Sequence, residues 1–167
     1  GNKIVVAGYV NDGTSFNGAV YRYNSNGSLD STFSGDGILP VNCGADEYLT
    51  SIVVDSGKIY IAGWSGPSDG SSADFIVARI NSNGTLDTAF SGDGKIKTDL
   101  GGYDSAYGMA VSSGKVVVAG MSDRSMYGGP HLCAITVYTS SGALDSTFSG
   151  DGKLKTSLGF PAPSISD

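Results

Sequence analysis

The sequence predicts an all-β protein built of antiparallel sheets, and three observations support this class. Two blocks of sequence each occur three times at a spacing of about 57 residues, so the 167-residue chain is a tandem repeat. Short apolar segments alternate with glycine- and asparagine-containing turns, which is typical of strands and hairpins. Amphipathic helical patterns are absent, which argues against parallel sheets joined by crossover helices.

Each repeat carries a lysine-started apolar block and a turn-rich block. The apolar block is Lys3–Gly8, and it returns as Lys58–Gly63 and Lys115–Gly120. The turn-rich block Asn24–Gly37 returns as Asn81–Gly94 and Thr139–Gly152. Many of the 26 glycines fall at matching places in these blocks, so they punctuate a scaffold. The units span about 1–45, 46–102 and 103–160, with 161–167 as the start of another.

Four short strands are expected in each complete unit. The first strand is 49–54 or 106–111, and the second is the lysine-started apolar block. The third is 18–23, 75–80 or 132–138, and the fourth is 38–41, 95–98 or 153–156. In the first unit Pro40 stands where the later units have lysine, and a proline in a strand favours a sheet edge.

The second strand is apolar at consecutive positions, which predicts that both of its faces are covered. Sheets stacked radially, blade against blade, cover both faces of a strand without helices. We therefore expect a β-propeller of four-stranded antiparallel blades.

The repeated unit also resembles the delta-60 repeat of bacterial proteins. The resemblance rests on the Gly-Lys-Ile/Val-x-Val-Ala-Gly block and on the later Asn-x-x-Gly-x-Leu-Asp-x-x-Phe-Ser-Gly-Asp-Gly block, and it covers nearly the whole chain. It implies a propeller of a kind found in large, often exported proteins, so we expect a secreted or bacterial cell-surface location. It implies no defined biochemical activity.

The chain carries three blades' worth of strands, with one blade shared between its two ends. It begins at a second strand, and residues 161–167 resemble the start of a first strand. Three blades fall below the four to eight that usually close a ring. Three outcomes follow: a six-bladed ring of two chains joined by exchange of the terminal strand, an open head-to-tail filament, or a window on a longer propeller.

Composition argues against several functional classes. His131 is the sole histidine, so it would have to be the base of any catalytic triad, and zinc sites built on several histidines and cysteines are excluded by count. Glu47 is the sole glutamate, so paired-carboxylate chemistry would have to use aspartates. The formal net charge of −6 disfavours a nucleic-acid surface, and no apolar run is long enough to span a membrane. We therefore expect no enzyme activity. Cys43 and Cys133 are expected to be separate thiols, although a disulfide would be compatible with export.

Candidate binding residues lie in and beside the loops that differ between units, because binding residues usually sit on such loops. Aromatic side chains there could stack on sugar rings or anchor a partner protein, or they could simply cover the blade ends. The candidates are the aromatic residues Trp64, Tyr103, Tyr107 and Tyr127 together with Arg124 and His131, and Tyr48 and Met126 lie beside them.

The turn-rich blocks place two aspartates per unit on the opposite side, and carboxylates are ligands for calcium. These residues are Asp30, Asp36, Asp87, Asp93, Asp145 and Asp151. Turn capping explains the same pattern, because an aspartate side chain commonly accepts a bond from its own turn. We therefore expect no cofactor, with calcium as the alternative.

Taken together, the sequence predicts a non-enzymatic structural or interaction module that assembles with itself or with another protein. The alternative function is carbohydrate binding through the variable loop face.

Overall fold

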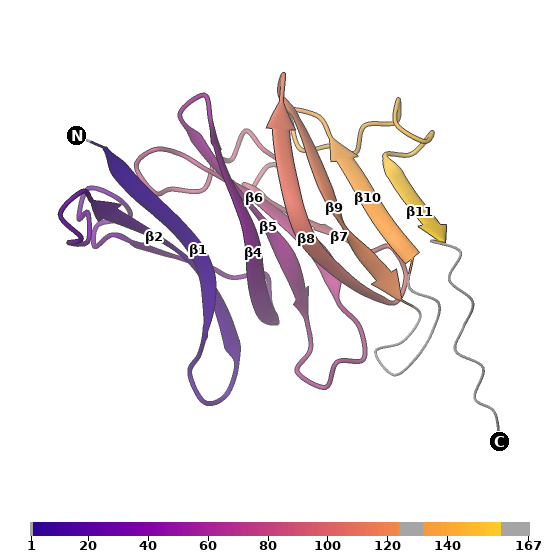
Figure 1. Ribbon diagram of the computed structural model, residues 1–167, viewed down its shortest axis with the longest axis horizontal. Coiled ribbons are helices and arrows are strands. Elements are labelled where there is room, and N and C mark those ends of the chain that lie inside the picture. Colours follow the sequence, from indigo (N-terminus) through magenta and orange to yellow (C-terminus); the bar gives the residue numbers. More distant parts are fainter. Residues whose placement is uncertain (1, 124–131, 158–167) are drawn as a thin grey trace.

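The computed structural model describes residues 2–123 and 132–157, and this part of the chain is all β (Figure 1). No helix of a length and hydropathy that would cross a membrane occurs among these residues. The strands are β1 Lys3–Asn11, β2 Phe16–Asn24, β3 Ile38–Val41, β4 Asp46–Asp55, β5 Lys58–Gly66, β6 Asp74–Ile80, β7 Lys95–Thr98, β8 Tyr103–Ser112, β9 Lys115–Asp123, β10 Leu132–Tyr138 and β11 Lys153–Ser157.

The strands form three antiparallel sheets in chain order. The first sheet has the order β1-β2-β3, the middle sheet β4-β5-β6-β7, and the last sheet β8-β9-β10-β11. In Figure 1 the sheets follow one another across the molecule, with β4 beside the first sheet and β8 beside the middle sheet. The all-β, antiparallel prediction is confirmed. The twelfth strand, expected at residues 161–167, lies outside the described residues.

Several strands are longer than the sequence predicted. The first strand of the later units begins at Asp46 and Tyr103. Tyr48 and Tyr103 therefore lie within strands, although the expected strands at 49–54 and 106–111 left them in loops. The strands extend over these polar and aromatic positions because the second strand of the unit continues alongside and pairs with them. Tyr48 pairs with Trp64, and Tyr103 pairs with Asp123. Pro40 lies in β3, which is the edge strand of its sheet, as predicted.

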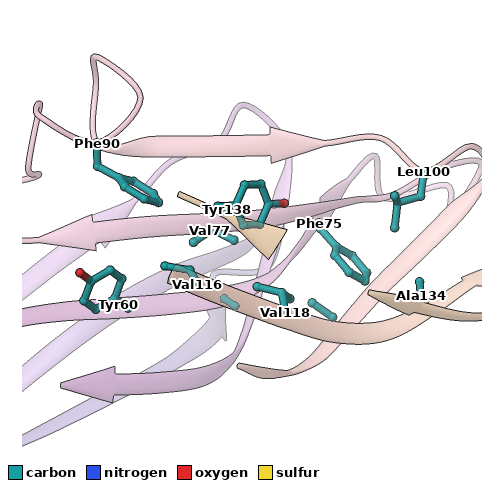
Figure 2. Packing of buried hydrophobic residues seen from close by; sticks show 11 residues of the cluster. Tyr60, Phe75, Val77, Phe90, Leu100, Val116, Val118, Ala134 and Tyr138 are labelled. Carbon is teal, nitrogen blue, oxygen red and sulfur yellow. The ribbon is translucent and has the colours of Figure 1, made fainter. Parts of the chain in front are cut away.

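Two hydrophobic clusters hold the three sheets together. One lies between the first and middle sheets and contains Val20, Phe33, Ile59, Ile61 and Ile76. The other lies between the middle and last sheets (Figure 2) and contains Tyr60, Phe75, Val77, Phe90, Val116, Val118 and Tyr138. Successive residues of β5 therefore enter opposite clusters, which accounts for its unbroken apolar sequence.

A β-bulge fixes the first strand of each four-stranded sheet. The ladder shifts register between Leu49 and Ser51 in β4 and between Ala106 and Gly108 in β8. The bulge presses backbone against the neighbouring strand: a Cβ atom at Gly63 would lie 1.9 Å from the Tyr48 carbonyl oxygen. The same distance separates a Cβ at Gly120 from the carbonyl oxygen of Ser105. Glycine is thus required where the bulged strand crosses its partner.

The two cysteines are free thiols, as expected. Cys43 is partly buried beside the first cluster, and burial raises the pKa of its thiol.

Candidate functional site

A row of aromatic side chains crosses the three sheets near the end that carries the variable loops. The Trp64 ring on β5 stacks on Tyr48 of β4, with centroids 5.2 Å apart and planes at 12°. Tyr107 of β8 meets Trp64 edge-on at 6.0 Å, and Tyr9 of β1 meets Tyr48 at 4.9 Å. Because Tyr48 and Tyr107 occupy the sides of Trp64, the exposed rings of this row are Tyr9 and Tyr107 at its two ends.

A small pocket of about 50 Å³ lies beside this row. Tyr48, Trp64 and Tyr103 line it together with the loop from Gly66 to Ala73. The indole nitrogen of Trp64 is buried without a hydrogen-bond partner among the described residues. Ligand pockets usually begin at roughly 300 Å³, so this hollow suits a few water molecules rather than a sugar ring.

The structure brings together three of the six candidate binding residues. Trp64, Tyr103 and Tyr107 lie on neighbouring strands at this end of the sheets. The other three, Arg124, Tyr127 and His131, lie outside the described residues, as does Met126. The row also includes Tyr9 and Phe16, which the sequence analysis did not single out. The sequence could have indicated them, because both lie close to the loop at residues 12–15 between β1 and β2, which is one of the loops that differ between units.

Three carboxylates that the sequence analysis missed converge at the same end. Asp74, Asp99 and Asp104 each offer an oxygen within 4.8 Å of the others, and this is the one such acidic group in the described part of the chain. Asp104 is buried and accepts a bond from the Leu100 N–H at 2.7 Å. Burial, and then the neighbouring Asp74 and Asp99, raise the pKa of Asp104. Lys97 lies 3.2 Å from Asp74 and offsets part of this negative charge.

On the opposite side, the first aspartate of each turn-rich block forms ion pairs. Asp30 contacts Lys3 at 2.8 Å and Arg22 at 2.7 Å, and Asp87 contacts Lys58 at 2.9 Å and Arg79 at 2.7 Å. Asp145 contacts Lys115 at 2.6 Å. Each lysine opens an apolar block, so the pairs tie the second strand to the turn of its own unit.

The second aspartate of each block caps its own turn. Asp36, Asp93 and Asp151 each accept a bond from the backbone N–H two residues later, at 2.9 Å. The six candidate calcium ligands therefore remain in their separate turns, and no three of them meet within the described residues. Their contacts agree with turn capping.

Acid should destabilise the fold through the ion-paired aspartates. Hydrogen bonds from Lys3 and Lys58 lower the pKa of Asp30 and Asp87, and the bond from Lys115 lowers that of Asp145 to about 2. A carboxylate with a lowered pKa in the folded state contributes stability above its unfolded pKa of about 3.9, and this contribution is lost as the pH falls below that value. We expect the melting temperature to fall steeply between about pH 4 and pH 2.

The substitution of Asp87 by asparagine should lower the melting temperature at pH 7 and flatten its decline in acid. Asp55→Asn is the matched control, because Asp55 takes part in no ion pair within the described residues. An equal acid response of both variants would contradict this assignment. Thermal melts by circular dichroism across the pH range provide the measurement.

With this geometry established, two segments of the chain were found to match a family model. Residues 2–33 and 55–90 match the model described as a domain of unknown function (DUF5122), beta-propeller. The match supports a β-propeller module. Each matched segment runs through the second and third strands of a unit to its motif phenylalanine, Phe33 or Phe90. The description fits a propeller-repeat family without the delta-60 name. A comparison with curated proteins found no match.

Proposed function

We propose that the chain is a non-enzymatic β-propeller module that joins head to tail with further copies of itself. Two copies would give a ring of six sheets, and an open series of copies would give a filament; a secreted or bacterial cell-surface location suits such a structural role. The observation that carries the proposal is the open edge of β1: among the described residues, no strand pairs with this edge, which is the position that β4 and β8 occupy in the other two sheets.

The free edge of β1 has the shape that a bulged strand needs. Gly8 occupies the position that Gly63 and Gly120 occupy in β5 and β9, at the end of the same Lys-to-Gly block. A Cβ atom at Gly8 would meet nothing within 4 Å, whereas at the other two it would strike the bulged strand. A missing strand in the first sheet accounts for this difference.

The neighbouring sheet also has an uncovered apolar position. Val54 of β4 is 61% exposed, while its counterpart one repeat later, Val111 of β8, packs against the hydrophobic cluster of the middle and last sheets. A strand on the edge of β1 would lie where it could cover Val54. The exposure of Val54 on the middle sheet is therefore a second indication that a strand is missing beside β1.

We assign the missing strand to residues 161–167 of a second copy. Ser164–Ile165 repeats the Ser51–Ile52 sequence of β4, and joining Asp167 to Gly1 of the next copy regenerates the strand-turn-strand pattern with one residue fewer. A strand added at a free edge gains main-chain hydrogen bonds along its whole length. If the chain is part of a longer propeller, a preceding unit would supply the same strand.

The experiment is sedimentation velocity across a concentration series. We expect the wild-type chain to associate and Gly8→Val to be folded but monomeric. Valine is compatible with a strand, but its side chain would occupy the space that the incoming strand needs beside β1. Gly108→Val is the matched control: a Cβ at this strand glycine also meets nothing within 4 Å, and its sheet already has four strands. Deletion of residues 161–167 should act like Gly8→Val. Association that survives both changes would contradict strand exchange.

Carbohydrate binding is the second candidate, and the aromatic row favours it. Tyr9 and Tyr107 present exposed rings at the two ends of the row, and exposed tyrosines pack well against the apolar faces of sugars. Glycan-array binding that is lost in Tyr107→Ala and reduced in Trp64→Ala would establish this function. An array without binding would leave self-association as the better account of the module.

A further inference from the structure

The contact between successive sheets is made twice in the chain by the same two loops. Phe33 from the turn-rich block of the first unit and Phe90 from that of the second are fully buried. The residue after each phenylalanine donates its backbone N–H to the asparagine-glycine or serine-glycine turn of the next unit, from Ser34 to the Asn83 oxygen at 2.9 Å and from Ser91 to the Ser141 oxygen at 2.8 Å.

Glycine makes this close contact fit. A Cβ atom at Gly84 would lie 2.4 Å from the Ser34 nitrogen, and one at Gly142 would lie 2.9 Å from the Ser91 nitrogen. Both glycines also have positive φ, at 87° and 88°. We call the Phe-Ser pair the plug and the four-residue turn ending in glycine the socket.

The last unit ends in a plug that meets no socket in the described part of the chain. Phe148 is half-buried, in contrast with Phe33 and Phe90. The loop nevertheless has the same form, because Ser149 has a φ of 52°, close to the 53° of Ser34 and the 58° of Ser91. The plug is therefore preformed.

The first unit, conversely, carries a socket that receives no plug from residues 2–123 or 132–157. Its turn is Asn24–Gly27, closed by the Gly27 N–H to the Asn24 oxygen at 3.0 Å, as Gly84 bonds to Asn81 at 2.9 Å. Gly27 has a φ of 85°, and a Cβ atom there would meet nothing within 4 Å. The socket is preformed and open.

The outer faces of the first and last sheets also match the two sides of the interface that joins successive sheets within the chain. On the outer face of the first sheet, Ile4 is 52% and Val6 44% exposed, whereas their counterparts Ile59 and Ile61 are 4% and 0% exposed between the sheets. On the outer face of the last sheet, Val117 is exposed, whereas its counterpart Tyr60 is buried. Each outer face therefore exposes apolar residues whose counterparts in the neighbouring repeat are buried between sheets.

We infer that the last sheet of one copy stacks on the first sheet of a second copy, with Phe148 and Ser149 seated on the turn Asn24–Gly27. This inference rests on the proposed self-association and specifies the contact that would accompany strand exchange. The contact between copies would have the same form as the contacts between sheets within the chain, because its plug, its socket and its two apolar faces are repeats of theirs.

This contact between copies lacks one element of the internal ones. Arg22 stacks over Phe33 and donates to the Ser82 oxygen in the next unit, and Arg79 stacks over Phe90 and reaches the Ser140 oxygen at 2.6 Å. The last unit has Val137 at the corresponding position. The contact between copies is thus the weakest junction in the series, and restoring the arginine should strengthen it.

The test measures the dissociation constant between copies by sedimentation for the full chain and three variants. Phe148→Ala should weaken association by roughly 30-fold, because an aromatic anchor at an interface contributes about 2 kcal/mol. Gly27→Asn should weaken it similarly, since asparagine tolerates positive φ but its side chain fills the socket. Val137→Arg should tighten association by about tenfold through one charge-assisted hydrogen bond and the stacking on Phe148.

Gly92→Asn is the matched control for Gly27→Asn. Gly92 has a φ of 88°, a Cβ atom there meets nothing within 4 Å, and it lies outside both the plug and the socket. Association that is unchanged in Phe148→Ala and Gly27→Asn yet lost in Gly8→Val would overturn the plug and socket while leaving strand exchange intact. A wild-type chain and a Val137→Arg variant that both remain monomeric at high concentration would overturn both proposals.

Discussion

Replacing Gly63 with alanine should destabilise the protein by more than about 3 kcal/mol, because the new methyl group would overlap a backbone oxygen far inside van der Waals contact. The Cβ position is 1.9 Å from the Tyr48 carbonyl oxygen and 2.9 Å from the Leu49 Cα. Neither atom belongs to a flexible side chain, so β4 and β5 must separate and lose ladder hydrogen bonds. For a chain of this size the melting temperature should fall by roughly 6–12 °C.

Gly8→Ala is the matched control for this substitution. It places the same methyl group at the same point of the repeat, and a Cβ there meets nothing within 4 Å. In dilute solution Gly8→Ala should leave the melting temperature within about 1 °C of wild type or raise it, since alanine is less flexible than glycine in the unfolded chain. Equal destabilisation by both variants would mean that the open edge of β1 is occupied.

Phe90→Ala should cost about 3–5 kcal/mol, as is typical for a fully buried phenylalanine. The side chain is 0% exposed, lies in the cluster shown in Figure 2, and receives the Arg79 guanidinium 4.8 Å from its ring centroid. Its removal therefore creates a cavity between the middle and last sheets and deprives Arg79 of its stacking partner. Urea unfolding at low protein concentration is the measurement.

Phe148→Ala provides the comparison for Phe90→Ala, because the two residues occupy the same place in successive units. Phe148 is only half-buried, so its removal in dilute solution should cost about half as much or less. The difference between the two variants should shrink as the protein concentration rises and a second copy covers Phe148. A constant difference would show that Phe148 gains no cover from association.

The repeat allowed much of the fold to be predicted from the sequence. The lysine-started blocks fall within β1, β5 and β9, and the turn-rich blocks fall between the third and fourth strands of each unit, as expected. This succeeded because three copies in register distinguish turn glycines such as Gly37 and Gly94 from incidental ones. The predicted role of Pro40 at a sheet edge followed from its missing N–H and is also confirmed.

The candidate site was harder to predict, because its residues are brought together by contacts between units. Tyr48 and Tyr103 were left outside the expected strands, since nothing local shows that the ladder extends past the apolar residues. The convergence of Asp74, Asp99 and Asp104 depends on the packing of β6 against β8, which sequence spacing does not reveal. The reach of Arg79 to the Ser140 oxygen likewise crosses 61 residues of sequence.

The native mass of the 167-residue wild-type chain, measured across protein concentrations, tests the central claim most directly. Self-association through the open edge of β1 predicts species at whole multiples of the chain mass that grow with concentration: a dimer alone for a closed ring of six sheets, or a continuing series for a filament. A monomer at every concentration, including those well above micromolar, would contradict the account.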